Sequence, residues 1–170
     1  MTLVVRPAGP GDTHRLDELA EIALGGLQNR RGGPGLQERW MGTSEGGTAR
    51  SHALSHLVDL PHLELVAHSG DEIYGVALAW IGIHAGSFTV YVGEGHRHAG
   101  VGPLLALAAQ EWLEDSGCVQ IDALALPGDR AMKNLLEKSG FKARLLTLRR
   151  GVSSHLDAGE QPGAEAAAES

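Results

Sequence analysis

The stretch that most constrains the fold runs from Val90 to Glu114, where an apolar run gives way to glycines and then to a helical pattern. Val90-Tyr91-Val92 has the composition of a strand end. Four apolar residues then recur at helical spacing along one face: Val101, Leu105, Ala108 and Trp112. Pro103 suits the first position of that helix, because its missing N–H would have no partner there, and Gly117 suits its end. The sequence therefore predicts a strand, a glycine-bearing loop and a helix in direct succession.

The start of this helix is a candidate anion site. Helix N-termini present free N–H groups and a partial positive charge, and Gly100 and Gly102 would let an anion approach the backbone. No acidic residue lies between Arg97 and Gln110, and Arg97 adds a full positive charge. The loop lacks the Gly-Lys-Ser/Thr ending of a nucleotide P-loop and the G-x-G-x-x-G dinucleotide fingerprint. We interpret it as a binding site for a diphosphate.

Length and charge indicate one domain with an acidic tail. The chain has 170 residues and a net charge of −7, and its last twenty residues hold four acidic and no basic side chains, which leaves −3 for residues 1–150. We expect a domain over 1–150 and a flexible tail over 151–170. A mildly acidic body argues against nucleic-acid or anionic-membrane partners. The single cysteine, Cys118, excludes an internal disulfide, and no signal peptide or spanning segment is evident, so we expect a cytoplasmic protein.

The periodicity along the chain predicts an α/β fold with a mixed sheet. Strands are expected at residues 3–6, 63–68, 73–83, 87–92, 118–126 and 141–149. Helices are expected from Asp12 or Thr13 to Gly25-Gly26, which would end or loosen that helix, over 49–58, from 103 to 116, and from Asp129 to Gly140. Helices packed on a sheet of this kind form a single core.

The segment from Arg30 to Arg50 is rich in Gly, Ser and Thr, and a connection this long is typically functional or mobile. Its Arg30-Arg31 pair is interpreted as a solvated basic spot. In the next expected helix, His52 and His56 stand at i, i+4, a spacing that can chelate a metal. They lack the intervening Glu of H-E-x-x-H and any obvious third ligand, so no metal site is predicted.

Three separated segments resemble the GCN5-related N-acetyltransferase superfamily. Arg97–Gly102 has the R-x-x-G-x-G spacing of its acetyl-CoA loop, and Glu137–Phe141 matches the E-K-x-G-F end of its last helix. The opening Arg6-Pro7-Ala8 with Asp12 matches the usual start of these domains. The resemblance covers residues 3 to 149. It implies a central mixed sheet flanked by helices, with the strands at 87–92 and 118–126 splayed apart.

The resemblance also implies acetyl-CoA, or another acyl-CoA, as cofactor. Pantetheine would pair with the backbone of Val90, Tyr91 and Val92, and a β-bulge amide near Val92 would polarise the acyl carbonyl. The remaining expected cofactor contacts are Arg97, His98, Ala99, Gly100, Val101, Gly102, Asp129 and Lys133. Asp129 stands where these proteins commonly carry Asn, and a carboxylate can only accept hydrogen bonds.

The implied activity is N-acetyl transfer to the amine of a small molecule or peptide, by direct attack in a ternary complex. Leu136 occupies the place of the tyrosine that often protonates the leaving thiolate, and a hydrocarbon cannot donate a proton. Glu94 and His84 are the candidate general bases, with His96 and Asp122 as further possibilities. The alternative is a non-catalytic acyl-CoA-binding or interaction domain. Relatives commonly dimerise, so a homodimer is also expected as a possibility.

Overall fold

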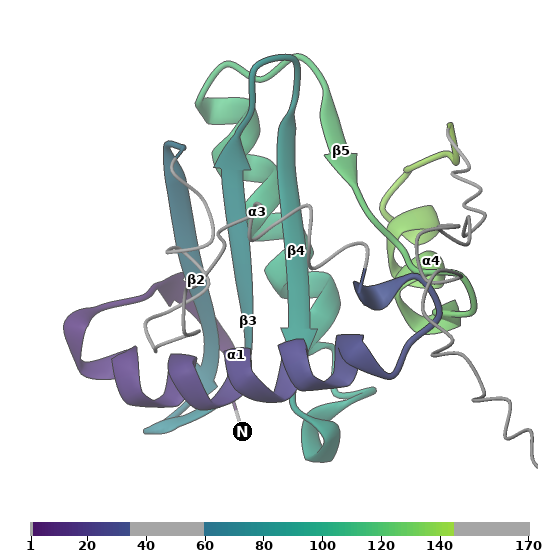
Figure 1. Ribbon diagram of the computed structural model, residues 1–170. Coiled ribbons are helices and arrows are strands. Elements are labelled where there is room, and N and C mark those ends of the chain that lie inside the picture. Colours follow the sequence, from purple (N-terminus) through teal and green to yellow (C-terminus); the bar gives the residue numbers. More distant parts are fainter. Residues whose placement is uncertain (1, 35–59, 145–170) are drawn as a thin grey trace, which may run out of the picture.

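The computed structural model describes residues 2–34 and 60–144, which form one five-stranded sheet (Figure 1). The strands lie in chain order: β1 (Val4–Pro7), β2 (His62–Ser69), β3 (Glu72–Ile81), β4 (Gly86–Val92) and β5 (Ile121–Ala123). The first four strands pair antiparallel, and β5 pairs parallel to β4. The prediction of a mixed sheet in an α/β fold is therefore confirmed.

Helices cover both faces of the sheet. α1 (Thr13–Gln28) crosses one face, α3 (Val101–Asp115) packs on the other, and α4 (Arg130–Lys138) lies beyond β5 (Figure 1). Two short 3₁₀ turns precede α1 and α3: η1 (Pro10–Asp12) and η3 (Glu94–His96). Within the described residues, no helix combines the length and the apolar character that crossing a membrane requires.

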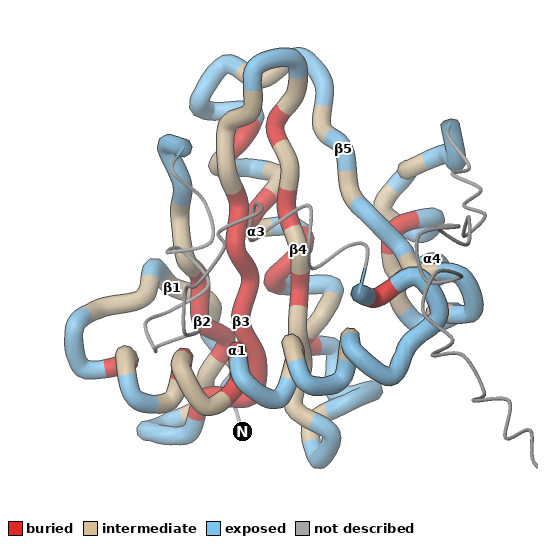
Figure 2. Tube along the Cα trace, in the orientation of Figure 1, coloured by how far each residue is buried: buried red, intermediate tan, exposed pale blue. Residues whose placement is uncertain are grey.

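The core has two layers because the central strands are buried on both faces (Figure 2). Alternate residues of a strand point to opposite faces, so Ala77 and Ala79 of β3 pack toward α3, while Val76 and Leu78 pack toward α1. Leu105, Ala109 and Leu113 fill the first layer, each without measurable exposure. Leu16, Leu19 and Ala20 fill the second. This double burial places β3 at the centre of the molecule, with β4 paired along its side.

The organising helix differs slightly from its prediction. It begins at Val101, two residues before Pro103, which still lies in the first turn where no N–H is required. Its fully buried face contains Ala109 and Leu113, while Ala108 and Trp112 are only partly buried. The buried face of the helix is thus rotated relative to the predicted one, so that Ala109 and Leu113 occupy it in place of Ala108 and Trp112. The small alanines are buried because the helix lies close against the sheet.

Two other boundaries were wrong. α1 continues through Gly25-Gly26 to Gln28, because both glycines are exposed and nothing there forces the chain to turn. The strand expected over 118–126 is paired only at Ile121–Ala123. The predicted strand over 141–149 is absent from its described part, residues 141–144. Four other predictions lie outside the described residues: the helix over 49–58, His52 with His56, the rest of that strand, and the tail.

Candidate functional site

The candidate site lies where β4 stops pairing with its parallel neighbour, β5. β4 and β5 pair at three positions, Gly86 with Ile121, Ser87 with Asp122 and Phe88 with Ala123. From Thr89 to Val92, β4 pairs within the described residues only with β3. Figure 1 shows β5 leaving the sheet toward α4. The splay expected between these strands is present.

The open edge of β4 offers the backbone of two residues. Gly93 donates its N–H to Tyr74 O across the β3–β4 ladder at 2.9 Å. Because backbone groups alternate in direction along an antiparallel ladder, the N–H and C=O of Val92 and Val90 face the open edge. Those of Tyr91 face β3, and its side chain packs toward α1. A ligand lying along this edge would therefore pair with Val90 and Val92, and not with Tyr91 as expected.

No bulge interrupts this part of the sheet. Every residue of β4 has one partner on β3, from Gly75 with Val92 to Ile81 with Gly86, so the expected bulge near Val92 is wrong. The register shift of this sheet lies instead between β2 and β3, at Ala67/His68. An amide that polarises a carbonyl at this edge would have to come from regular strand.

The loop after β4 carries free donors. His98 and Gly100 both adopt left-handed conformations, with φ of 69° and 81°. Within the described part of the chain, the N–H groups of His98, Gly100, Val101 and Gly102 donate no hydrogen bond, while Ala99 donates to His96 O at 3.4 Å. Val101 is 1% exposed, so the accessible donors are the other three. They lie at the N-terminus of a fifteen-residue helix, where an anion is stabilised.

Side chains tie this loop to the sheet. The His96 ring stacks on Tyr74 with ring centroids 4.0 Å apart, and its Nε2 lies 3.3 Å from Glu72 Oε1. Arg97 is half-exposed and faces Glu94 at 3.6 Å, an exposed pair that contributes little to stability. The charge of Arg97 is therefore available to a ligand. The stacking of His96 was not foreseen, since no spacing in the sequence relates it to Tyr74.

The α4 side of the opening is organised by Asp129. One of its oxygens accepts the Met132 N–H at 3.0 Å and caps α4, and the other accepts from Arg30 at 2.5 Å. Both oxygens therefore have partners, and Asp129 positions α4 against the end of α1. Lys133 forms an ion pair with Glu137 at 2.7 Å on the exposed face of α4. Leu136 is 6% exposed and belongs to the core.

The two candidate bases lie at opposite ends of β4. Glu94 follows its last residue in η3, and its side chain is 81% exposed. His84 precedes its first residue in the exposed β3–β4 turn. A seven-residue strand spans about 23 Å. The unpaired part of β4 is its last four residues, Thr89–Val92, so Glu94 follows that open end by two residues while His84 lies at the opposite, paired end. Asp122 lies exposed where β5 is still paired with Ser87.

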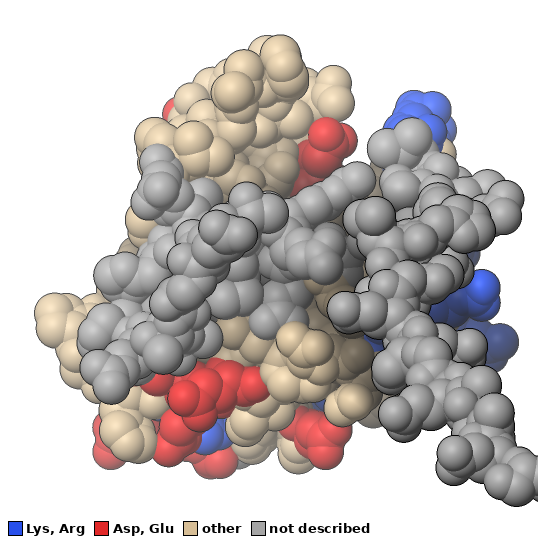
Figure 3. Space-filling model, viewed as in Figure 1, with Lys and Arg blue, Asp and Glu red and all other residues tan. Residues whose placement is uncertain are grey.

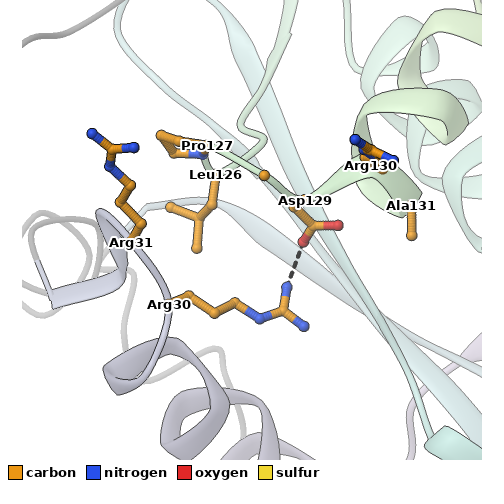
Figure 4. A pocket seen from close by; sticks show the side chains of 8 residues that line it. Arg30, Arg31, Leu126, Pro127, Asp129, Arg130 and Ala131 are labelled. Carbon is orange, nitrogen blue, oxygen red and sulfur yellow. Dashed lines mark hydrogen bonds and ion pairs between the residues drawn. The ribbon is translucent and has the colours of Figure 1, made fainter.

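Two surface depressions border these elements. One of about 260 Å³ lies between α1 and η3, and its lining includes Arg15, Tyr91 and Glu94. The other, of about 350 Å³, lies between the residues that follow α1 and the loop that leads into α4 (Figure 4). Figure 3 shows acidic side chains gathered over α1 and basic ones beside α4. The charge of this acidic protein is thus unevenly distributed.

Comparison with known proteins identifies a matching family and solved structures with the same fold. Residues 36–141 match the model of the acetyltransferase (GNAT) family. None of the curated proteins matches the sequence at a significant level. Among solved structures, a Pyrococcus furiosus protein assigned as an acetyl transferase is 20% identical with a TM-score of 0.64, covering 89% of this chain and 100% of that one.

Two further structures are an aminoglycoside acetyltransferase without ligand and a protein solved with acetyl-CoA. The aminoglycoside 6′-N-acetyltransferase AAC(6′)-IG of Acinetobacter haemolyticus, in its apo form, is 17% identical with a TM-score of 0.55 over 88% of this chain and 99% of that one. A Clostridium acetobutylicum protein assigned as an acetyltransferase, with acetyl-CoA, is 16% identical with a TM-score of 0.58 over 88% and 96%. Identities this low establish a shared fold only.

Proposed function

We propose that this chain, which belongs to the acetyltransferase (GNAT) family, transfers an acetyl group from acetyl-CoA to the amine of an acceptor bound in the same complex. The observation that carries the proposal is the unpaired edge of β4, which leads directly into a loop of free N–H groups at the start of α3. A strand edge followed by an anion site matches a ligand that joins an amide-bearing chain to a diphosphate.

The residues present fit such a cofactor. The backbone groups of Val90 and Val92 would pair with the pantetheine amides, and the N–H groups of His98, Gly100 and Gly102 would hold the diphosphate. When bound, acetyl-CoA supplies an acyl group on a thiolate leaving group. The role of the chain is to orient that group at the open edge and to admit the amine beside it.

Proton transfer does not require a dedicated side chain in this proposal. The amine nitrogen attacks the carbonyl carbon, the C–S bond breaks, CoA leaves as the thiol or thiolate, and the amine proton passes to water. Glu94 and His84 lie at the ends of β4, and Leu136 is buried in the core. A positioned base or acid contributes about 10²- to 10⁴-fold, so its absence slows the reaction without abolishing it.

Two measurements on the full chain test this proposal. Acetyl-CoA at saturating concentration should raise the melting temperature, because a ligand that binds only the folded state stabilises it by mass action. Mixing with a panel of amines should release free thiol, with an aminoglycoside included because of the AAC(6′)-IG likeness. Arg97→Gln should raise several-fold the acetyl-CoA concentration that is needed for a given rise in melting temperature. Lys142→Gln, which removes an exposed charge elsewhere, should leave that concentration unchanged.

A non-catalytic acyl-CoA-binding domain is the second candidate, favoured by the burial of Leu136 and by the position of Glu94. Both candidates predict stabilisation by acetyl-CoA, and only the enzyme predicts thiol release. No stabilisation by CoA or its thioesters would contradict both. Stabilisation without thiol release for any amine in the panel would favour the binding domain.

A further inference from the structure

The Arg30-Arg31 pair stands at an unusual turn after α1. Gly32 adopts φ of +82°, and a Cβ on Gly33 would lie 1.7 Å from Leu27 O, so only glycine fits at the second position. The turn rests on the segment before α4, since a Cβ on Gly32 would stand 3.5 Å from Pro127 Cδ. Arg30 is therefore held against a distant part of the chain through Asp129, while Arg31 is exposed at the same turn.

This turn forms one wall of the 350 Å³ depression, whose lining includes three arginines and one aspartate. Arg30 is paired with Asp129, whose other oxygen caps α4. Arg31 and Arg130 have no ion-pair partner within residues 2–34 and 60–144. Figure 4 shows them on either side of the Arg30–Asp129 pair. Among the described residues, the depression thus carries two positive charges without an ion-pair partner, on a protein of net charge −7.

The depression lies apart from the loop that would hold the diphosphate. Its lining residue Leu126 stands three positions after β5 ends at Ala123, on the strand that leaves the sheet. The anion loop at His98–Gly102 stands at the start of α3 and borders α4 at Leu135, beyond the residues that line the depression. A volume of 350 Å³ is within the range of small-molecule sites. The depression is bordered by the residues that lead from β5 into α4, and β5 is the strand that diverges from the open edge of β4.

We propose that this depression binds the carboxylate of the acceptor, so that the substrate is a small amine that also carries a carboxylate group. Guanidinium groups bind carboxylates through paired, charge-assisted hydrogen bonds that a neutral amide cannot match. The same two charges repel polycationic amines such as aminoglycosides. This inference rests on the proposed acetyl transfer and names the class of its acceptor.

Matched acceptors test the inference through thiol release by the full chain. β-Alanine and glutamate should exceed β-alaninamide and glutamine in kcat/KM by about tenfold or more, the scale of one charge-assisted contact. The double variant Arg31→Gln/Arg130→Gln should bring these ratios close to one, with little change for the carboxamides. Lys142→Gln is the charge-matched control and should keep the ratios. Equal or reversed preference in the wild type, or an unchanged ratio in the double variant, would overturn the inference.

A binding measurement separates failure of this inference from failure of the proposed function. Calorimetric titration of the full chain with succinate and with succinamide needs no turnover. Succinate binding that disappears in Arg31→Gln/Arg130→Gln would support the carboxylate site even if no amine released thiol. Thiol release from amines, together with no succinate binding and no carboxylate preference, would keep the enzyme and remove the carboxylate site.

Discussion

Gly100 and Gly102 lie two residues apart in the anion loop, but only one of them needs to be glycine for conformational reasons. Gly100 has φ of +81° and open space around its Cβ position, so Gly100→Ala should cost about 1–2 kcal/mol through backbone strain alone. A Cβ on Gly102 would meet Leu135 and Val92 at ordinary 3.7 Å contacts, and Ala is the better helix former. Gly102→Ala should therefore be neutral or stabilising. Urea unfolding of both variants measures this, and equal losses would contradict it.

Asp12 makes the stability dependent on pH. Arg6 donates to both of its oxygens at 2.6 and 2.9 Å, and Gly9 N–H donates at 2.7 Å. These bonds lower the pKa of Asp12 from 3.8 to about 2. A lowered folded pKa gives stability that is present above pH 4 and is lost as the pH falls to about 2.

The variant Asp12→Asn removes this contribution. At pH 7 it should lose about 1–2 kcal/mol of unfolding free energy, after allowance for solvent around the half-exposed Arg6. The difference from the wild type should shrink steadily below pH 4. Chemical unfolding at pH 7, 4 and 2.5 measures it, and a pH-independent difference would mean that Asn disturbs packing instead.

A single substitution tests whether Glu94 acts as the general base. Its exposed carboxylate faces Arg97 at 3.6 Å, at the end of β4. Glu94→Gln should leave kcat within about threefold and tighten acetyl-CoA modestly, because Arg97 gains freedom to meet the diphosphate. A loss of kcat of about 10² or more, with an altered pH profile and unchanged acetyl-CoA binding, would instead make Glu94 the general base.

Among the elements, the ends of α3 and α4 could be predicted from the sequence, whereas the ends of α1 and β5 could not. Gly117 ends α3 at φ of +86°, with Cys118 N–H bonded to Leu113 O, and Gly140 ends α4 in the same way. Such ends depend on local residues, so the sequence predicts them. β5 ends at Ala123 because its neighbour diverges, a long-range fact that the apolar pattern to Leu126 does not contain.

The position of α4 depends on the two oxygens of Asp129, and three variants separate their contributions. Asp129→Ala removes the helix cap and the ion pair, and should cost about 1–2 kcal/mol. Asp129→Asn keeps a capping oxygen, so it should cost less than about 1 kcal/mol, as should Arg30→Gln. Urea unfolding compares them. A loss in Arg30→Gln as large as that in Asp129→Ala would show that the ion pair, not the cap, holds α4.

On the scale of the whole molecule, the strand, loop and helix of the candidate anion site could be predicted from the sequence, but the contacts of Arg30 could not. Arg97–Gly102 is one continuous segment, so its spacing alone indicated the site. Arg30 and Asp129 stand 99 residues apart, and no periodicity relates them. The turn at Gly32-Gly33 that brings them together is visible only in the folded chain. The depression lined by these residues therefore depends on tertiary contacts that the sequence does not reveal.

The two sides of the opening join the sheet differently. β1–β4 share long ladders and are covered by α1 and α3, whereas β5 pairs through three residues and α4 packs on the core through Leu136. A cofactor that spans the opening would touch both sides and tie them together. Amide hydrogen exchange with saturating acetyl-CoA should therefore slow in α4 and at residues 98–102, with little change in β2 and β3, which are already buried in the core.

CoA without its acetyl group is the matched control, because it offers the same diphosphate and pantetheine contacts and should slow the same amides. Inorganic phosphate should protect the loop at residues 98–102 and at most the adjoining part of α4 near Leu135, and should leave the start of α4 unchanged. Protection of the loop by all three ligands without any change in α4 would show that the cofactor does not span the opening. The edge of β4 would then not be its binding surface.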